Sequence, residues 1–165
     1  MKVICDATVL IGLAKIGKLD LLKKLYRNIY IPLGVYQEVV VRSRNRPGAE
    51  EIDGAKWIRK IRARDQASVD LLVSELGQGE SEVLVLGKEF KADLLILDDS
   101  RARTAAISAG FRIMGLAGLL LLAKQRNVIQ NVKPLFDELM DKNFRLSQKI
   151  IQTILEKAGE CKDCG

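Results

Sequence analysis

The chain has 165 residues, of which 48% are hydrophobic, so it is long enough to bury one core, and its length favours one domain over two. Its 27 Lys and Arg against 21 Asp and Glu give a formal charge of +6, which would attract a polyanion such as RNA, although a basic solvated surface explains the same excess. The sequence contains no His, which excludes Ser-His and Cys-His nucleophilic pairs, His-pair ribonuclease chemistry and zinc-hydrolase sites. A hydrolase with this composition must use carboxylates and hard metal ions.

The first ten residues, MKVICDATVL, contain one Lys before a short apolar stretch that an Asp interrupts, which does not predict a signal peptide. The longest later apolar run, at 116–123, is too short to span a bilayer. Three cysteines, an odd number, suggest no disulfide framework. Cys161 and Cys164 form a CxxC, but a structural zinc site needs about four ligands. We expect a cytoplasmic protein with no membrane segment.

Apolar runs and helical periodicity alternate along the chain and predict these elements in order. They are a strand at 3–5, helices at 9–14 and 19–26, a strand at 29–31, a helix at 32–41, an exposed loop at 42–54, a strand at 57–58, a helix capped by Asp65 or Ser68 that carries 69–76, a helix at 80–90, a strand at 94–97, a helix at 101–108, a strand at 111–114, and helices at 118–125, 131–141 and 146–157. Strands that alternate with helices imply right-handed crossovers and a covered parallel sheet.

The last two predicted helices are amphipathic, so their apolar faces must pack on the body of the protein or on a partner. We therefore expect a first domain at 1–127, a helical extension packed on it at 128–158, and a flexible tail at 159–165.

Acidic residues follow two of the predicted strands. Asp6 comes directly after the strand at 3–5, and Asp98 and Asp99 follow the strand at 94–97. Ligand sites in parallel α/β sheets lie at the carboxyl ends of strands, so these carboxylates would share an edge if the two strands are neighbours. Helix capping explains any one Asp equally well, but a cap needs one acceptor, and Asp98, Asp99 and Ser100 supply three.

Three glutamates are further candidates. Glu80 and Glu82 stand at a helix start, where the helix dipole favours an anion, and helical geometry sets them about 200° apart. Glu82 shares a face with buried positions and is the better candidate for an inward carboxylate. Glu38 flanks an apolar stripe, and a helix salt link to Arg42 is its ordinary explanation.

The order of these acids resembles that of PIN-domain nucleases, the family that includes VapC-type toxins. The segments that carry the resemblance are VICDATVLIGL, IPLGVYQEVV, GQGESEVLVLGKEF and ADLLILDDSRART, and residues 115–147 further resemble the C-terminal helical extension of a prokaryotic branch of the family. The resemblance implies a three-layer α/β/α fold with a central parallel sheet and extra C-terminal helices. It also makes Asp6, Glu38, Glu82 with Glu80, and Asp98 or Asp99 the catalytic acids and metal ligands.

By the same resemblance the metal is Mg²⁺ or Mn²⁺ and the activity is endoribonuclease hydrolysis that leaves a 5′-phosphate and a 3′-hydroxyl, as in the toxin of a toxin–antitoxin pair. RNA, an antitoxin protein and a second copy of the chain are then the expected partners. Four polar residues beside the acids would contact substrate, namely Thr8, Ser100, Arg101 and Arg103. The basic segments at 42–46 and 59–64 would contact RNA or an acidic partner, or remain solvated. The alternative is a PIN-like module that keeps the fold but has lost catalysis and binds RNA or regulates.

Overall fold

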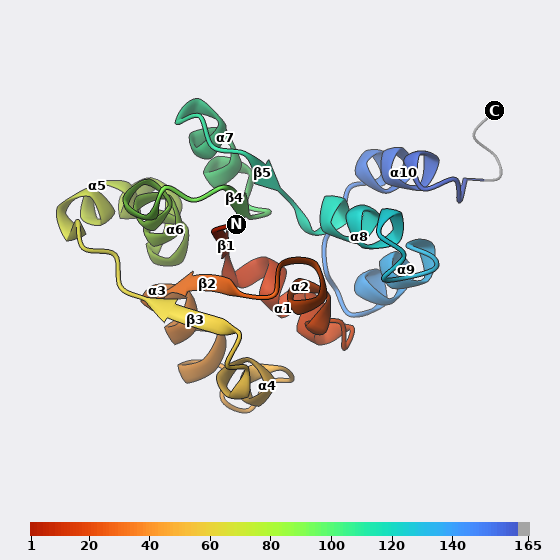
Figure 1. Ribbon diagram of the computed structural model, residues 1–165, viewed down its shortest axis with the longest axis horizontal. Helices are drawn as coiled ribbons and strands as arrows, with labels where there is room; N and C mark the ends of the chain where they lie inside the picture. The colour runs from red at the N-terminus through yellow and green to blue at the C-terminus, as the bar shows by residue number, and fades with distance from the viewer. Residues whose placement is uncertain (162–165) are drawn as a thin grey trace.

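The strand predicted at the start of the chain lies at the centre of a five-stranded parallel sheet in the computed structural model, which describes residues 1–161 (Figure 1). The strands are β1 (Val3–Cys5), β2 (Ile29–Pro32), β3 (Ile58–Ile61), β4 (Leu94–Ile96) and β5 (Ile113–Met114), in the order β3-β2-β1-β4-β5. Every neighbouring pair is parallel, as expected for strands joined by helical crossovers. β1 and β4 are buried along their whole length, which is typical of central strands covered on both faces.

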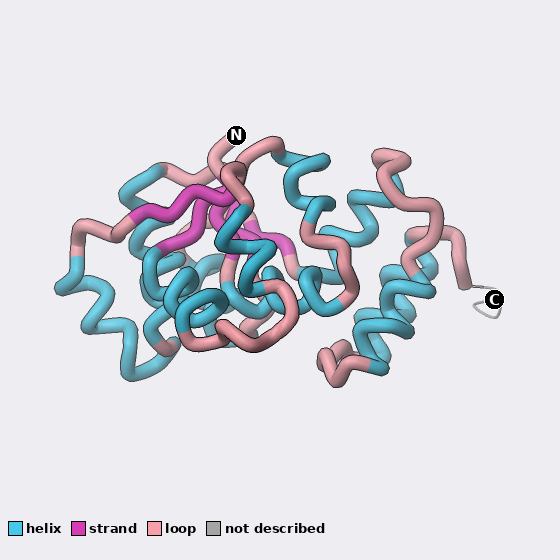
Figure 2. Tube along the Cα trace, turned by 90° about the horizontal axis from the view of Figure 1, so that it is seen from below, coloured by secondary structure: helices cyan, strands magenta, loops and turns pink. Residues whose placement is uncertain are grey.

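Helices flank the sheet and make up most of the remaining chain (Figures 1 and 2). They are α1 (Ala7–Lys15), α2 (Asp20–Tyr26), α3 (Leu33–Tyr36), the π-helix η1 (Gln37–Val41), α4 (Ala49–Gly54), α5 (Gln66–Leu76), α6 (Gln78–Phe90), α7 (Ser100–Ser108), α8 (Leu116–Gln125), α9 (Lys133–Asp141) and α10 (Gln148–Lys157). The predicted three-layer fold with a central parallel sheet is therefore confirmed.

Most predicted elements are present with ends shifted by one to a few residues, and three regions differ in kind or extent. The expected loop at 42–54 contains α4, a helix of six residues whose Ala49 and Ile52 are buried. The helix expected at 32–41 changes its hydrogen-bonding pattern after Tyr36 and continues as the π-helix η1. β3 extends beyond the predicted 57–58 to Ile61, because β2 supplies backbone hydrogen-bond partners. The charged sequence of this stretch does not indicate a strand.

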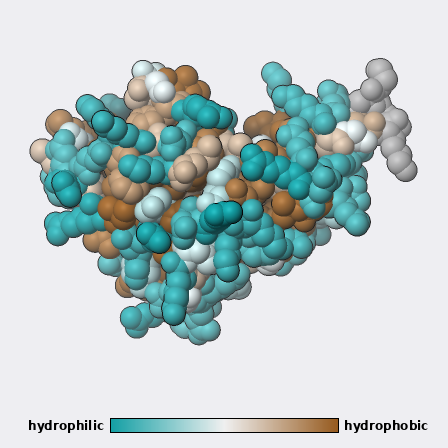
Figure 3. All heavy atoms as spheres, viewed as in Figure 1, coloured by the Kyte–Doolittle hydropathy of each residue, from teal (hydrophilic) through white to brown (hydrophobic). Residues whose placement is uncertain are grey.

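The C-terminal helices form a lobe beside the body (Figure 2), and α10 packs on α8. The lobe meets α1 at Gly12, where an added Cβ would lie 2.7 Å from the ring of Phe144. Apolar residues show on the surface where α8 and α9 meet the body (Figure 3). Buried side chains of α9 and α10, including Phe136 and Leu155, belong to the same apolar cluster as the sheet.

Glu160, which follows α10, forms hydrogen bonds with the start of α9. Its carboxylate accepts the backbone N–H groups of Val132 and Lys133 and pairs with Lys124 at 2.9 Å. Residues 162–165, the rest of the tail predicted to be flexible, lie outside the described residues. Within residues 1–161, no helix is both long enough and apolar enough to cross a membrane.

Candidate functional site

Asp6 lies directly beyond β1 and begins the candidate site. Its side chain is 1% exposed, and its Oδ1 accepts the backbone N–H of Val9 at 2.9 Å, which caps α1. Its Oδ2 accepts the backbone N–H of Asp98 at 3.2 Å. This second bond crosses from β1 to β4, two strands that pair with Cys5 opposite Ile96. The predicted meeting of these two strand ends at one sheet edge is therefore confirmed.

Asp98 and Asp99 follow β4 and have different partners. Both oxygens of Asp98 lie 3.2 Å from the backbone N–H of Leu116 at the start of α8. Asp99 caps α7 by accepting the backbone N–H of Ala102 at 2.9 Å. Each Asp of the pair thus stabilises the start of a different helix, and both remain half-buried beside Asp6.

Glu38 comes from the opposite side of the site, on the exposed face of η1. A π-helical turn is rare, and such turns occur often at functional sites because they redirect a side chain. Glu38 Oε2 lies beside Gly79 at the start of α6, where an added Cβ would be 3.4 Å from this oxygen, an ordinary contact distance. η1 and α6 therefore bring Glu38 and Glu80 to one place.

Glu80 and Glu82 occupy two sides of α6. Glu82 is 4% exposed, and its carboxylate lies against Gly34 of α3, where any added Cβ would collide with it. Its Oε2 is buried without a hydrogen-bond partner among the described residues. Glu80 is half-buried and faces the other acids.

Glu38, Glu80 and Glu82 line one hollow of about 510 Å³ between α3, η1 and the start of α6. Arg42 and Arg62 are the cationic residues that line the same hollow. Arg42 follows η1, and Arg62 follows β3. The hollow therefore combines carboxylates with two guanidinium groups, which can contact a phosphate group.

The acids perturb one another's protonation. Burial raises the pKa of Asp6 from 3.8 to about 7, two backbone hydrogen bonds oppose this rise, and the charges of Asp98 and Glu80 add to it. Burial also raises the pKa of Glu80, and the charges of Glu38 and Asp99 raise it further. Burial raises the pKa of Asp98, while its bond from Leu116 and the charge of Arg103 lower it. Glu80 therefore interacts electrostatically with acids from three other segments, at Asp6, Glu38 and Asp99.

The acidic side chains within residues 1–161 do not form a preorganised metal-binding site. Within residues 1–161, no three Asp, Glu or Cys side chains are grouped closely enough to hold one ion. The donor chemistry nevertheless suits a hard cation, since the acids supply only carboxylate oxygens and Glu82 Oε2 is a buried acceptor without a donor. Binding an ion would require the acids to close around it.

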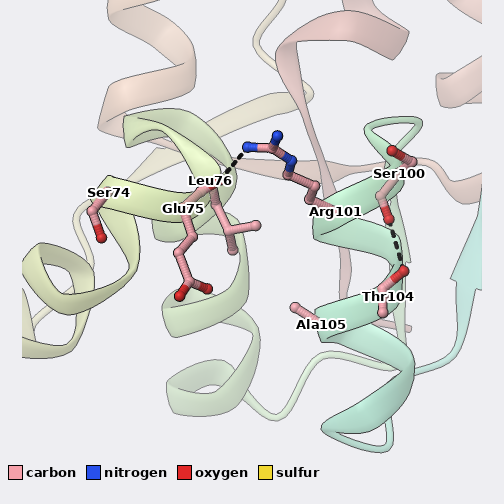
Figure 4. Close-up of a pocket in the computed structure, with 7 residues that line it drawn as sticks. All are labelled: Ser74, Glu75, Leu76, Ser100, Arg101, Thr104 and Ala105. Carbon is pink, nitrogen blue, oxygen red and sulfur yellow. Dashed lines mark hydrogen bonds between the residues drawn. The ribbon is translucent and has the colours of Figure 1, made fainter.

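Two of the four predicted substrate contacts lie in a hollow that is not lined by the candidate acids, and the other two lie near Asp98 and Asp6. Ser100 and Arg101 line a hollow between α5 and α7, where Arg101 points to α5 and donates to the backbone oxygen of Glu75 at 3.4 Å (Figure 4). Arg103 donates to the Leu97 oxygen at 3.3 Å and lies 3.9 Å from Asp98 Oδ1. Thr8 is exposed on the first turn of α1, two residues from Asp6.

Sequence reasoning missed the role of Gly34. Its small size is what allows α3 to approach α6 so closely that the Glu82 carboxylate contacts the α3 backbone. The available signal was a Gly inside an otherwise apolar helical pattern, LGVYQEVV, which indicates a close approach.

The parallel sheet, with acids gathered beyond the ends of its two central strands, defines an α/β protein of the nuclease type. A family model described as a PIN domain matches residues 2–160, and the chain therefore belongs to the PIN-domain family. Members of this family are generally nucleases that use divalent metal ions. No curated protein matches the chain.

Proposed function

We propose that this protein is a metal-dependent endoribonuclease that hydrolyses RNA with Mg²⁺ or Mn²⁺ held by the carboxylates at the sheet edge. The carrying observation is the position of Glu80, whose pKa is raised by burial and by the charges of Glu38 and Asp99, and whose own charge acts on Asp6. Like charges so placed favour a cation between them, because a bound cation relieves their repulsion while the carboxylates stay ionised.

The proposed ligands are Asp6, Glu38, Glu80 and one of Asp98 and Asp99, with Glu82 as the acid directly behind them. When bound, the ion would neutralise the phosphodiester and lower the pKa of an attacking water. Mg²⁺ and Mn²⁺ suit this set because both prefer oxygen ligands.

The protein's own groups supply orientation and attraction. Two backbone N–H groups, from Val9 and Asp98, orient both oxygens of Asp6. Arg42 and Arg62 border the hollow and would attract the phosphates of RNA towards it. The Asp98 carboxylate, held by Leu116, stands beside Asp6 as a second oriented acid.

The test is cleavage of end-labelled structured and unstructured RNAs by the purified full-length chain, with EDTA, Mg²⁺ or Mn²⁺. We expect metal-dependent cleavage with 5′-phosphate products, no cleavage of single-stranded DNA of the same sequence, and loss of cleavage in Glu80→Gln. Glu75→Gln is the matched control, because Glu75 is an exposed acid on α5 outside the acidic hollow. Cleavage that persists in EDTA or in Glu80→Gln contradicts the proposal.

The second candidate is a catalytically inactive PIN-like module that binds RNA or regulates. The absence of a group of three acids close enough to hold one ion, within residues 1–161, favours it. Isothermal titration with Mn²⁺ separates the two functions. Saturable binding that Glu80→Gln abolishes supports the nuclease, whereas RNA binding without any Mn²⁺ binding supports the module.

The proposed biological role is that of a toxin restrained by an antitoxin, in a chain that forms a homodimer. If so, induced expression should arrest growth, and Glu80→Gln should remove the arrest at equal protein level. Sedimentation of the purified chain tests the dimer independently of activity. Growth that is unaffected by an RNA-cleaving wild-type chain would retain the nuclease and reject the toxin.

A further inference from the structure

A second hollow, on the other side of η1 from the acids, has an apolar wall and a basic one. It encloses about 290 Å³, and its apolar wall includes Ile11 of α1, Val39 of η1 and Ile52 of α4. Its basic wall consists of Lys15, Arg46 and Lys142. Val39 and Ile52 are buried, whereas Arg46 and Lys142 are exposed, so the apolar residues form the floor and the cations the rim.

Two of the three cations at this hollow, Lys15 and Arg46, have no acidic partner among residues 1–161. No Asp or Glu lines the hollow. Lys142 has one acidic neighbour, with its Nζ 3.6 Å from Glu138 Oε1. The two unpaired cations, Lys15 and Arg46, beside an apolar floor produce a positive potential that favours an anion.

The two lysines are also held in place. Lys15 Nζ donates to the backbone oxygen of Lys142 at 3.4 Å, and Lys142 Nζ donates to the backbone oxygen of Lys15. These reciprocal bonds keep two like charges close together across the junction of α1 and the C-terminal lobe. Held cations bind an anion at a lower cost in conformational entropy than free ones.

We propose that this hollow, with its volume of about 290 Å³, binds a small carboxylate that has an apolar body. The apolar body would lie on Ile11, Val39 and Ile52, and the carboxylate would meet Lys15 and Arg46. The small volume favours a free carboxylate over a peptide segment. This binding site is independent of the nuclease activity proposed above.

The test compares three probes that share one apolar body, namely octanoate, octan-1-ol and octylammonium, titrated into the full-length ¹⁵N-labelled chain below their aggregation concentrations. We expect saturable shifts at the backbone of the hollow with octanoate, and binding of the alcohol and the amine that is about tenfold weaker or more, since a hydrogen bond to a charged group is worth about that factor. Equal binding of all three probes, or no saturable shift with octanoate, would overturn the proposal.

Charge-removing variants locate the site. Lys15→Gln and Arg46→Gln should each weaken octanoate binding about five- to tenfold, because each removes one charged hydrogen-bond donor. Lys18→Gln is the matched control, since Lys18 lies three residues beyond Lys15 and does not line the hollow. Because Lys15 and Arg46 support no ion pair, neither variant should change the circular dichroism spectrum.

Two results contradict the assignment directly. Octanoate affinity that is unchanged in both variants would place the ligand elsewhere. An acidic peptide with one apolar side chain that binds the same residues more tightly than octanoate would make the hollow a protein-docking site instead.

Discussion

Asp6→Asn should remove a pH dependence that the buried carboxyl imposes on the stability of the metal-free chain. Burial raises the pKa of Asp6 from 3.8 to about 7 in the folded state. Between these two pH values the unfolded chain has lost this proton and the folded chain still holds it. The stabilising contribution is therefore fully present below about pH 4 and is lost as the pH rises through about 7.

The magnitude follows from the difference in pKa. A shift of about 3 units at 1.36 kcal/mol each corresponds to roughly 4 kcal/mol of unfolding free energy lost between about pH 4 and pH 8. Asn carries no charge and escapes this loss, but its amide group cannot accept the Asp98 N–H that Asp6 Oδ2 accepts at 3.2 Å. Leaving that donor unpaired costs about 1–3 kcal/mol. We therefore expect the variant to be less stable than the wild type at pH 4 and more stable by about 1–3 kcal/mol at pH 8.

The assay is urea unfolding, followed by circular dichroism in EDTA, of both proteins at matched pH values from 4 to 8. The difference between the two cancels every other titrating group to first order. Asp70→Asn is the control for the same substitution at an exposed position of α5. A difference for Asp6→Asn that also stays constant within about 1 kcal/mol would refute the reasoning.

Repeating the unfolding assay with Mn²⁺ in place of EDTA tests whether Asp6 is a metal ligand. At pH 8 an ion that binds the folded wild type stabilises it by about 2.7 kcal/mol when its concentration is 100 times its dissociation constant. Asp6→Asn should lose this gain, because it lacks the ionised ligand. Equal stabilisation of both proteins by Mn²⁺ would place the metal away from Asp6.

Three further outcomes test the packing. Gly34→Ala places a Cβ against the buried Glu82 carboxylate and should lower the unfolding free energy by about 1–3 kcal/mol, whereas Gly54→Ala, which meets open space, should change it little. In Glu160→Gln the helix α9 loses a charged cap, at a cost of about 1–3 kcal/mol. Burial raises the pKa of this carboxyl, but its hydrogen bonds outweigh burial and lower it, so the wild-type advantage should be present at neutral pH and fall as the pH drops through that lowered pKa. Phe144→Ala should cost about 2 kcal/mol and loosen the C-terminal lobe from α1, which amide exchange at α10 would detect, and unchanged exchange would show that the ring does not hold the lobe.

The central strands could be predicted because their signal is local. The runs at 3–5 and 94–97 are short, β-rich and wholly apolar, which indicates strands covered on both faces. Alternation with helices then implies parallel neighbours, and each strand ends at an acid. The sequence therefore predicts that Asp6 and Asp98 share one edge if the two strands are neighbours, and the pairing of β1 with β4 meets that condition.

The elements α4, β3 and η1 were harder to predict because tertiary contacts stabilise them. α4 has six residues, too few to show a helical period, and it depends on burial of Ile52 and on the bond from Tyr36 to Asp53 at 2.7 Å. The charged stretch IRKI becomes a strand only because β2 is available as its neighbour. The π-helical turn at η1 has no signature in QEVVV that separates it from an ordinary helix.

The two glutamates of α6 show why burial and participation in a site are separate questions. Helical geometry correctly sets Glu80 and Glu82 on different sides, and the apolar pattern correctly predicts that Glu82 is buried. But α6 is buried on several sides, with an unbroken buried run from Ser81 to Gly87, so it has no single inward face. One buried side meets α3 at Gly34, and the half-buried side meets the sheet edge where Asp6 lies. The charge of Glu80 acts on Asp6, and the charges of Glu38 and Asp99 act on Glu80. We therefore propose Glu80 as the acid of this pair that joins the other carboxylates, with Glu82 buried beside it against Gly34.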